Sequence, residues 1–128
     1  MGYSRVIWGM TAALWLVIAV LWCVWFGWGA AAVAIVFAIL PDVALIGAFA
    51  APGKLRPERV SFYNTMHSVP IAVGVLAIGV AVFLLTGGIN GGIWAVGLAG
   101  LAWFVHIAAD RAFGFGLRAA DGSIIPVV

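Results

Sequence analysis

Two histidines and two aspartates are the residues of this chain whose types and spacing can do chemistry. Asp42 follows a proline in the stretch LPDVALIG, and His67 lies in YNTMHSVP. His106 and Asp110 lie four residues apart in FVHIAADR, so on a helix they share one face. Two imidazoles and two carboxylates form a ligand set that suits zinc, iron or manganese. The four residues are therefore candidate metal ligands and candidate catalytic groups.

Two kinds of chemistry fit such a site. A catalytic metal ion keeps one coordination position open and lowers the pKa of its bound water to about 7. Asp42 or Asp110 would then be a ligand, or would orient a histidine. Without a metal, a carboxylic acid in a low-dielectric cavity can stay protonated. Asp42 would then act as the general acid, with His67 or His106 as the base. The first chemistry predicts hydrolysis, and the second predicts isomerisation or terpene-type cyclisation of an isoprenoid.

The composition shows that these groups lie in a membrane protein. Of 128 residues, 66% are hydrophobic and only 8% are charged, and the mean hydropathy is +1.25. A soluble domain is about half apolar and a quarter charged. The ten charged side chains cannot cover a water-facing surface, so we expect an integral membrane protein. The net charge of +2 then points to anionic lipid headgroups and not to nucleic acid. Cys23 is the single cysteine, so no intramolecular disulfide can form.

Four apolar stretches are each long enough to cross a bilayer, which takes about 20 residues. We expect an all-α integral membrane protein, a four-transmembrane-helix bundle in a single domain over residues 1–128. The predicted spans are residues 6–26, 30–51, 61–86 and 93–113. The first apolar run has 21 residues, longer than the roughly 7–15 residues of the apolar region in a signal peptide, so we expect it to be retained.

The basic residues predict the orientation of these spans. All six lie near the chain ends, in the last turn of the fourth span or in the loop between the second and third spans: Arg5, Lys54, Arg56, Arg59, Arg111 and Arg118. The two opposite loops, GWG and GGINGG, carry no charge. Because lysine and arginine collect on the cytoplasmic side, both termini are expected there (N-in, C-in). The expected location is the inner, cytoplasmic membrane of a bacterium, as a multi-pass protein.

This topology brings the ionisable groups to one depth. Asp42 lies nine residues before the predicted end of the second span, about 13 Å deep. His67 lies six residues into the third span, about 9 Å deep. His106 and Asp110 come in the last turns of the fourth span, within about 10 Å of the same boundary. An isolated charge at mid-membrane costs about 2.5–3.5 kcal/mol, so we expect these groups to pair in the interior.

Five further residues are candidates for binding a substrate beside this site. Tyr63 and Asn64 share a helix face with His67. Trp103 offers an aromatic face that stabilises a cation. The guanidinium groups of Arg111 and Arg118 suit an anionic headgroup or a diphosphate. The alternative for all these residues is a buried packing network, and for Arg111 a side chain that snorkels to the interface.

Three sequence blocks resemble a known family. LPDVALIG, YNTMHSVP and WFVHIAADRAFGFGLR are similar to the motif blocks of domain of unknown function family 4260, small bacterial proteins with four membrane spans. The resemblance covers roughly residues 40–118. It carries over to these positions: Pro41, Asp42, Tyr63, Asn64, His67, Pro70, His106, Asp110, Arg111, Gly114 and Gly116. The family usually has lysine after a final GYGL, where this chain has GFGLR. The resemblance supports a site without naming a reaction.

A second, weaker likeness is to bacterial membrane-bound metal-dependent hydrolases. They share LPD in one helix and HS in a later one, which this chain has at Leu40–Pro41–Asp42 and His67–Ser68. The further histidine that the likeness implies soon after the aspartate is absent from this sequence. The likeness favours a metal, and that departure puts the ligand set in doubt.

Together, these features predict a small membrane enzyme with a His/Asp site at the inner leaflet. The expected substrate is a lipid or isoprenoid-like hydrophobic small molecule, the expected partners are membrane lipids, and the expected cofactor is a divalent metal (Zn, Fe or Mn). Metal-free isomerisation or cyclisation is one alternative. A non-catalytic scaffold or transporter subunit is another, although the outer halves of the spans hold few polar residues for a transport route. Four spans also leave room for a homo-oligomer.

Overall fold

Four long apolar helices make up most of the protein. The structure is a computed structural model and describes residues 2–128. In this part of the chain, four helical stretches are long and apolar enough to cross a membrane: Tyr3–Phe26, Trp28–Leu45, Pro57–Leu85 and Ala95–Phe113. This confirms the predicted all-helical membrane architecture with four spans.

The first two helices form an antiparallel pair joined by one residue. Helix α1 covers Tyr3–Phe26, and helix α2 covers Trp28–Ile39. Gly27 stands between them with φ of +88°, a conformation that glycine adopts without the steric cost of a Cβ atom. The second helix continues as a 3₁₀ helix, η1, over Leu40–Leu45. This arrangement places Asp42 on η1, at the opposite end of the pair from Gly27.

The second predicted span is longer than the helical segment in the structure. The predicted span extends to Ala51, but the helical backbone ends at Leu45. Strand β1, Phe49–Ala51, instead pairs antiparallel with strand β2, Lys54–Leu55. Pro41 lacks a backbone N–H and its ring crowds the preceding turn, so the α-helix gives way to 3₁₀ there. Gly47 then adopts φ of +64° and turns the chain into the hairpin.

The third predicted span consists of two helices. Helix α3 covers Pro57–Met66 and helix α4 covers Val69–Leu85, so the helix starts before the predicted Ser61 and breaks at His67. Pro57 stands at the first helical position, where its missing N–H costs nothing. Pro70 cannot bond to the carbonyl of Met66 four residues earlier and clashes with it. The break therefore falls between Met66 and Val69, and His67 sits in it.

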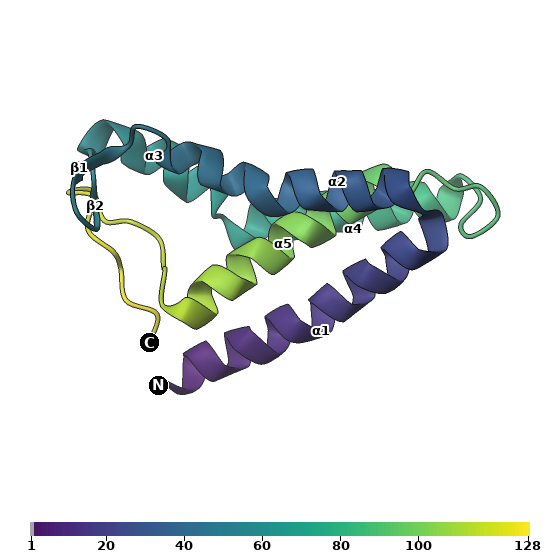
Figure 1. Cartoon of the computed structure of the whole chain (residues 1–128), viewed down its shortest axis with the longest axis horizontal. Coiled ribbons are helices and arrows are strands. Elements are labelled where there is room, and N and C mark those ends of the chain that lie inside the picture. Colours follow the sequence, from purple (N-terminus) through teal and green to yellow (C-terminus); the bar gives the residue numbers. More distant parts are fainter. Residues whose placement is uncertain (1) are drawn as a thin grey trace.

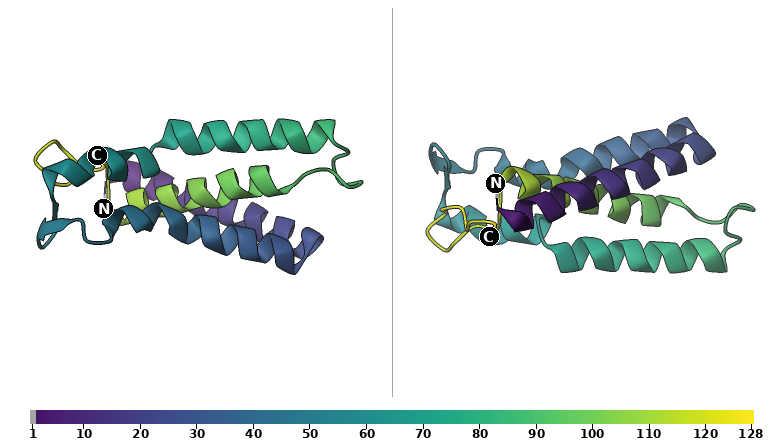
Figure 2. Two further views of the ribbon diagram at one scale, coloured as in Figure 1. Left: turned by 90° about the horizontal axis from the view of Figure 1, so that it is seen from above. Right: turned by 90° about the horizontal axis from the view of Figure 1, so that it is seen from below.

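Helix α5, Ala95–Phe113, is the centre of the bundle. Half of its apolar stretch is buried inside the protein, against 6% of the apolar stretch of α1. Figure 2 shows α5 between α4 on one side and the α1–α2 pair on the other. Gly79 of α4 faces Gly97 of α5, and Gly100 of α5 faces the backbone of Leu76. Small residues at these crossings let α4 and α5 approach closely.

The two ends of the bundle differ in charge. Figure 1 shows the α1–α2 turn and the 86–94 loop at one end, and both termini, the hairpin and α3 at the other. The segments that carry the six basic residues all lie at the second end. The charge asymmetry predicted from the sequence is therefore present in the fold.

The C-terminal tail is irregular but tied to the hairpin. Arg118 is buried, and its Nη1 donates to the carbonyls of Gly53 at 2.7 Å and Gly122 at 3.2 Å. The backbone N–H of Leu55 donates to the Gly122 carbonyl at 3.0 Å. A Cβ atom at Gly122 would collide with the carbonyl oxygen of Leu55. These contacts fix the tail against β2 and close the charged end of the bundle.

Candidate metal centre

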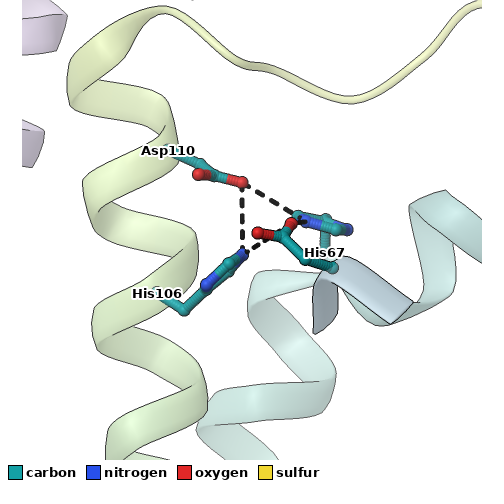
Figure 3. A group of neighbouring side chains, drawn as sticks. His67, His106 and Asp110 are labelled. Atoms are coloured by element: carbon teal, nitrogen blue, oxygen red, sulfur yellow. Dashed lines mark ion pairs between the residues drawn. The ribbon is translucent and has the colours of Figure 1, made fainter. Parts of the chain in front are cut away.

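Four side chains from three parts of the fold converge at the charged end of the bundle. Asp42 comes from η1, His67 from the break between α3 and α4, and His106 and Asp110 from α5. Each offers one possible ligand atom, and these atoms all lie within 4.8 Å of one another. Figure 3 shows His67, His106 and Asp110 pointing toward a common point from the two sides of the site. The structure thus brings together all four predicted metal ligands, which we call the His/Asp cluster.

Both histidines approach both carboxylates through the same ring nitrogen. Nε2 of His67 lies 3.6 Å from Oδ1 of Asp42 and 3.3 Å from Oδ2 of Asp110. Nε2 of His106 lies 3.3 Å from Oδ1 of Asp42 and 3.4 Å from Oδ2 of Asp110. The four atoms therefore alternate, nitrogen and oxygen, around a small central space.

The other ring nitrogen of each histidine is bonded to the backbone. Nδ1 of His67 lies 2.9 Å from the carbonyl oxygen of Tyr63, and Nδ1 of His106 lies 2.6 Å from that of Ala38. A carbonyl oxygen only accepts, so Nδ1 must carry a proton in both rings. In the neutral ring, Nε2 then presents a lone pair. Metal-binding histidines are usually held in this way, with the second nitrogen donating to a carbonyl or carboxylate.

The lone pairs of these two nitrogens are left without a partner. Both Nε2 atoms are buried and make no hydrogen bond within residues 2–128. Two lone pairs facing two carboxylate oxygens repel unless a positive charge lies between them. The repulsion is removed by protons on the rings or on the carboxyl groups, or by a cation in the central space.

The distances favour a cation over protons. A charge-assisted N–H···O bond is typically about 2.7–2.9 Å long, shorter than all four nitrogen–oxygen distances of 3.3–3.6 Å. Four donor atoms at these spacings can surround a single ion at roughly 2.1–2.4 Å, close to the Zn–N and Zn–O bond lengths of about 2.0–2.2 Å. Two neutral imidazoles and two carboxylates also carry a total charge of −2, which a divalent cation neutralises. The donor set and its spacing therefore fit such an ion.

A helix break positions His67. The backbone N–H of His67 donates to the Tyr63 carbonyl at 3.0 Å, and its ring stacks on the Tyr63 ring with centroids 4.0 Å apart. The carbonyl of Met66, deprived of its usual partner by Pro70, accepts the indole N–H of Trp103 at 2.7 Å. His67 is left 3% exposed, with little freedom to turn away from the cluster.

A second change in helix geometry positions His106. At η1 the backbone switches to 3₁₀ bonding, in which each N–H reaches the third preceding carbonyl and not the fourth. The Ala38 carbonyl, one turn before Asp42, then accepts from His106. Each histidine is therefore oriented by a main-chain oxygen at a place where a proline interrupts regular helix.

The predicted substrate-binding residues divide into two groups. Tyr63, Asn64, Trp103 and Arg118 are all used inside the protein. The Tyr63 hydroxyl lies 3.4 Å from the Gly116 carbonyl, and Asn64 exchanges two hydrogen bonds with the backbone of Arg118, at 2.9 and 2.8 Å. These four residues hold the cluster and the tail in place. Arg111 differs, because its guanidinium lies over the Trp8 ring and its side chain makes no hydrogen bond in the described part of the chain.

Sequence reasoning missed the residues that act through their backbone. The carbonyls of Ala38 and Met66 orient the site, one directly and one through Trp103, and neither side chain carries a signal. The prolines are the feature of the sequence that points to these carbonyls. Pro70 lies four residues after Met66, and Pro41 lies three residues after Ala38. A proline in a span releases a nearby carbonyl, which then needs a donor.

Fold and site define a class: a small multi-pass membrane protein with a His/Asp cluster at the basic end of a four-helix bundle. The chain belongs to the family described as Domain of unknown function (DUF4260), whose model matches residues 7–124. This confirms the family resemblance of the three sequence blocks. No curated protein and no solved structure matches the chain. The likeness to membrane-bound metal-dependent hydrolases therefore gains no support from these comparisons.

Proposed function

We propose that this protein is a membrane-embedded metalloenzyme that hydrolyses a lipid or isoprenoid-like substrate. The observation that carries the proposal is that the buried Nε2 atoms of His67 and His106 have no hydrogen-bond partner among residues 2–128. Each faces two carboxylate oxygens while its Nδ1 donates to a backbone carbonyl. We propose Zn²⁺, Fe²⁺ or Mn²⁺ as the ion, because histidine and carboxylate together suit these metals.

The exposure of the cluster supports a reactive role over a purely structural one. The side chain of His67 is 3% exposed and that of His106 is 10% exposed, while Asp42 is 48% and Asp110 23% exposed. The histidines thus form the floor of the site, and the carboxylates form its open rim. An ion that accepts a further ligand beyond the four side chains would activate water and polarise a substrate oxygen as a Lewis acid. A substrate would approach from the side of Asp42.

An apolar cavity beside the cluster supports the substrate class. It has a volume of about 570 Å³ and lies between α1, α2 and α5, within the usual range of ligand pockets. Its wall along α2 runs from Gly27 to Ala38, about 16 Å, which is about half of the 30 Å hydrocarbon core. Ala38, at the end nearest the cluster, is the residue whose carbonyl accepts from His106. A single aliphatic or prenyl chain fits this cavity.

The orientation follows from the charges. We propose that the basic end of the bundle faces the cytoplasm, so that both termini lie inside and the cluster lies at the inner leaflet of a bacterial cytoplasmic membrane. The cluster is complete within one chain, so the proposed chemistry does not require the homo-oligomer that four spans leave room for.

The test is metal-dependent turnover with a matched carboxylate control. The purified protein would be stripped with a chelator, reloaded with Zn²⁺, Fe²⁺ or Mn²⁺, and assayed on long-chain acyl esters, prenyl esters and prenyl phosphates. Asp42→Asn removes one anionic ligand, whereas Glu58→Gln makes the same change at an exposed acid in the first turn of α3. We expect activity to return with metal, to fall about 100-fold or more in Asp42→Asn, and to be unchanged in Glu58→Gln.

Two results would contradict the proposal. Equal turnover by Asp42→Asn and the wild type would show that the cluster does not perform the reaction. A wild type that binds metal but turns over none of the ester or phosphate substrates would assign the metal a structural role. Activity on an isoprenoid that persists after chelation would instead support acid–base isomerisation or cyclisation by the same residues.

A further inference from the structure

Arg111 differs from the other arginines of the chain in the contacts that its guanidinium group makes. Arg5, Arg59 and Arg118 each donate to at least one backbone carbonyl, and Arg56 is exposed. Arg111 is partly buried, its Nε is buried, and its side chain makes no hydrogen bond within residues 2–128. A guanidinium offers five donors, so a ligand could engage several of them at once.

The surroundings of Arg111 form a second pocket, separate from the apolar cavity. This pocket has a volume of about 270 Å³ and is lined by Arg111, Ser4 and Trp8 together with Gly116, Leu117 and the tail residues 125–128. The guanidinium carbon of Arg111 lies 5.1 Å from the centre of the Trp8 ring, a cation–π contact that supports the planar group on one face. The edge of the guanidinium, which carries its N–H groups, is left for a ligand.

No acidic side chain within residues 2–128 forms an ion pair with Arg111. The ion pairs within residues 2–128 all join a histidine to Asp42 or Asp110. Asp110 precedes Arg111 in sequence, but its Oδ2 is directed to the two histidines. A partly desolvated guanidinium without a counter-charge is unfavourable, and a carboxylate or phosphate group satisfies it with two parallel hydrogen bonds.

The place of Arg111 in the fold suggests which anion this is. Arg111 lies in the last turn of α5, at the end of the fourth apolar span, where lipid phosphates lie next to a membrane protein. Arginine binds phosphate in a bidentate manner that lysine cannot reproduce. We propose that the Arg111 pocket is a binding site for a phosphate-type anion, either the headgroup of a lipid or free phosphate. The site does not depend on the metal or on the proposed hydrolysis.

The test measures ligand-dependent thermal stability in a non-ionic detergent. Inorganic phosphate and a water-soluble short-chain phosphatidate would each be titrated against the wild type, Arg111→Gln, Arg111→Lys and Arg56→Gln. A ligand that binds only the folded state raises the unfolding temperature according to its concentration and Kd. We expect binding about 10-fold or more weaker in Arg111→Gln, an intermediate loss in Arg111→Lys, and wild-type binding in Arg56→Gln.

The two probes distinguish free phosphate from a lipid headgroup, and the variants show whether the anion binds in the Arg111 pocket. A shift with both probes would mean that phosphate alone is sufficient, and a shift with phosphatidate only would mean that the lipid chain is also required. Binding at a metal ion would persist in Arg111→Gln, because that variant keeps the His/Asp cluster. Equal shifts in the wild type and Arg111→Gln, or no shift with either probe, would overturn the proposal and leave Arg111 as an interfacial side chain. If Arg111→Gln does not fold, an Arg111→Lys variant that binds as tightly as the wild type would overturn it equally.

Discussion

Replacement of Gly100 by alanine is expected to lower the free energy of unfolding by about 3 kcal/mol or more. A Cβ atom at this position would collide with the backbone of Leu76 and Val75 on α4. Backbone atoms cannot swing aside as a side chain does, so α4 would have to move away from α5. Gly79→Ala should act in the same way, because its Cβ would meet the backbone of Gly97.

Gly74→Ala is the matched control for this prediction. Gly74 lies on the same helix α4, and a Cβ atom there would meet nothing within 4 Å. Alanine is favoured over glycine inside a helix by about 1 kcal/mol, so this variant should be as stable as the wild type or more so. Unfolding in detergent, by heat or by added dodecyl sulfate, would give the ranking. Equal stability of Gly100→Ala and Gly74→Ala would contradict the close packing of α4 on α5.

Removal of metal is expected to destabilise the wild type and to leave His106→Gln unaffected. A ligand at 100 to 1,000 times its Kd contributes about 2.7–4.1 kcal/mol to the folded state, so a chelator should lower the unfolding temperature by several degrees. His106→Gln removes one of the two buried Nε2 atoms while keeping a side chain of similar length. This variant should unfold at a lower temperature than the wild type, with little further change on chelation.

The control for the metal prediction is Glu58→Gln, which lies outside the cluster. It should respond to the chelator as the wild type does. A chelator that lowers the unfolding temperatures of the wild type and His106→Gln by the same amount would show that the metal binds elsewhere. Readdition of the metal should restore the wild-type temperature, which separates metal loss from an effect of the chelator on the detergent.

The sequence predicted the arrangement of the cluster because hydropathy and charge determine the topology. Four apolar spans and six basic residues at one end bring Asp42, His67, His106 and Asp110 to a common depth without any knowledge of side-chain packing. The end of α5 at Phe113 and of α1 at Phe26 also agree with the predicted spans, because glycines follow both. The lengths of the apolar stretches are thus sufficient to predict most of the architecture.

The local breaks in the helices could not be placed from hydropathy alone. The stretch Phe49–Ala51 is as apolar as a helix end, yet it pairs as a strand once Pro41 and Gly47 have turned the chain. The hydropathy predicts His67 within one long helix. In the structure, Pro70 divides that helix into α3 and α4. The hydrogen bonds of Asn64 and Arg118 with backbone far along the chain were equally invisible, because they depend on how the tail folds back onto α3.

The most direct test of the metal centre is elemental analysis of the detergent-purified protein. The wild type should contain about one zinc, iron or manganese ion per chain, as expected for a single four-ligand site. Asp110→Asn and His106→Gln, purified as folded species, should contain much less, and Glu58→Gln should contain as much as the wild type. A well-folded wild type without these metals, or one whose metal content is unchanged in both cluster variants, would contradict the assignment.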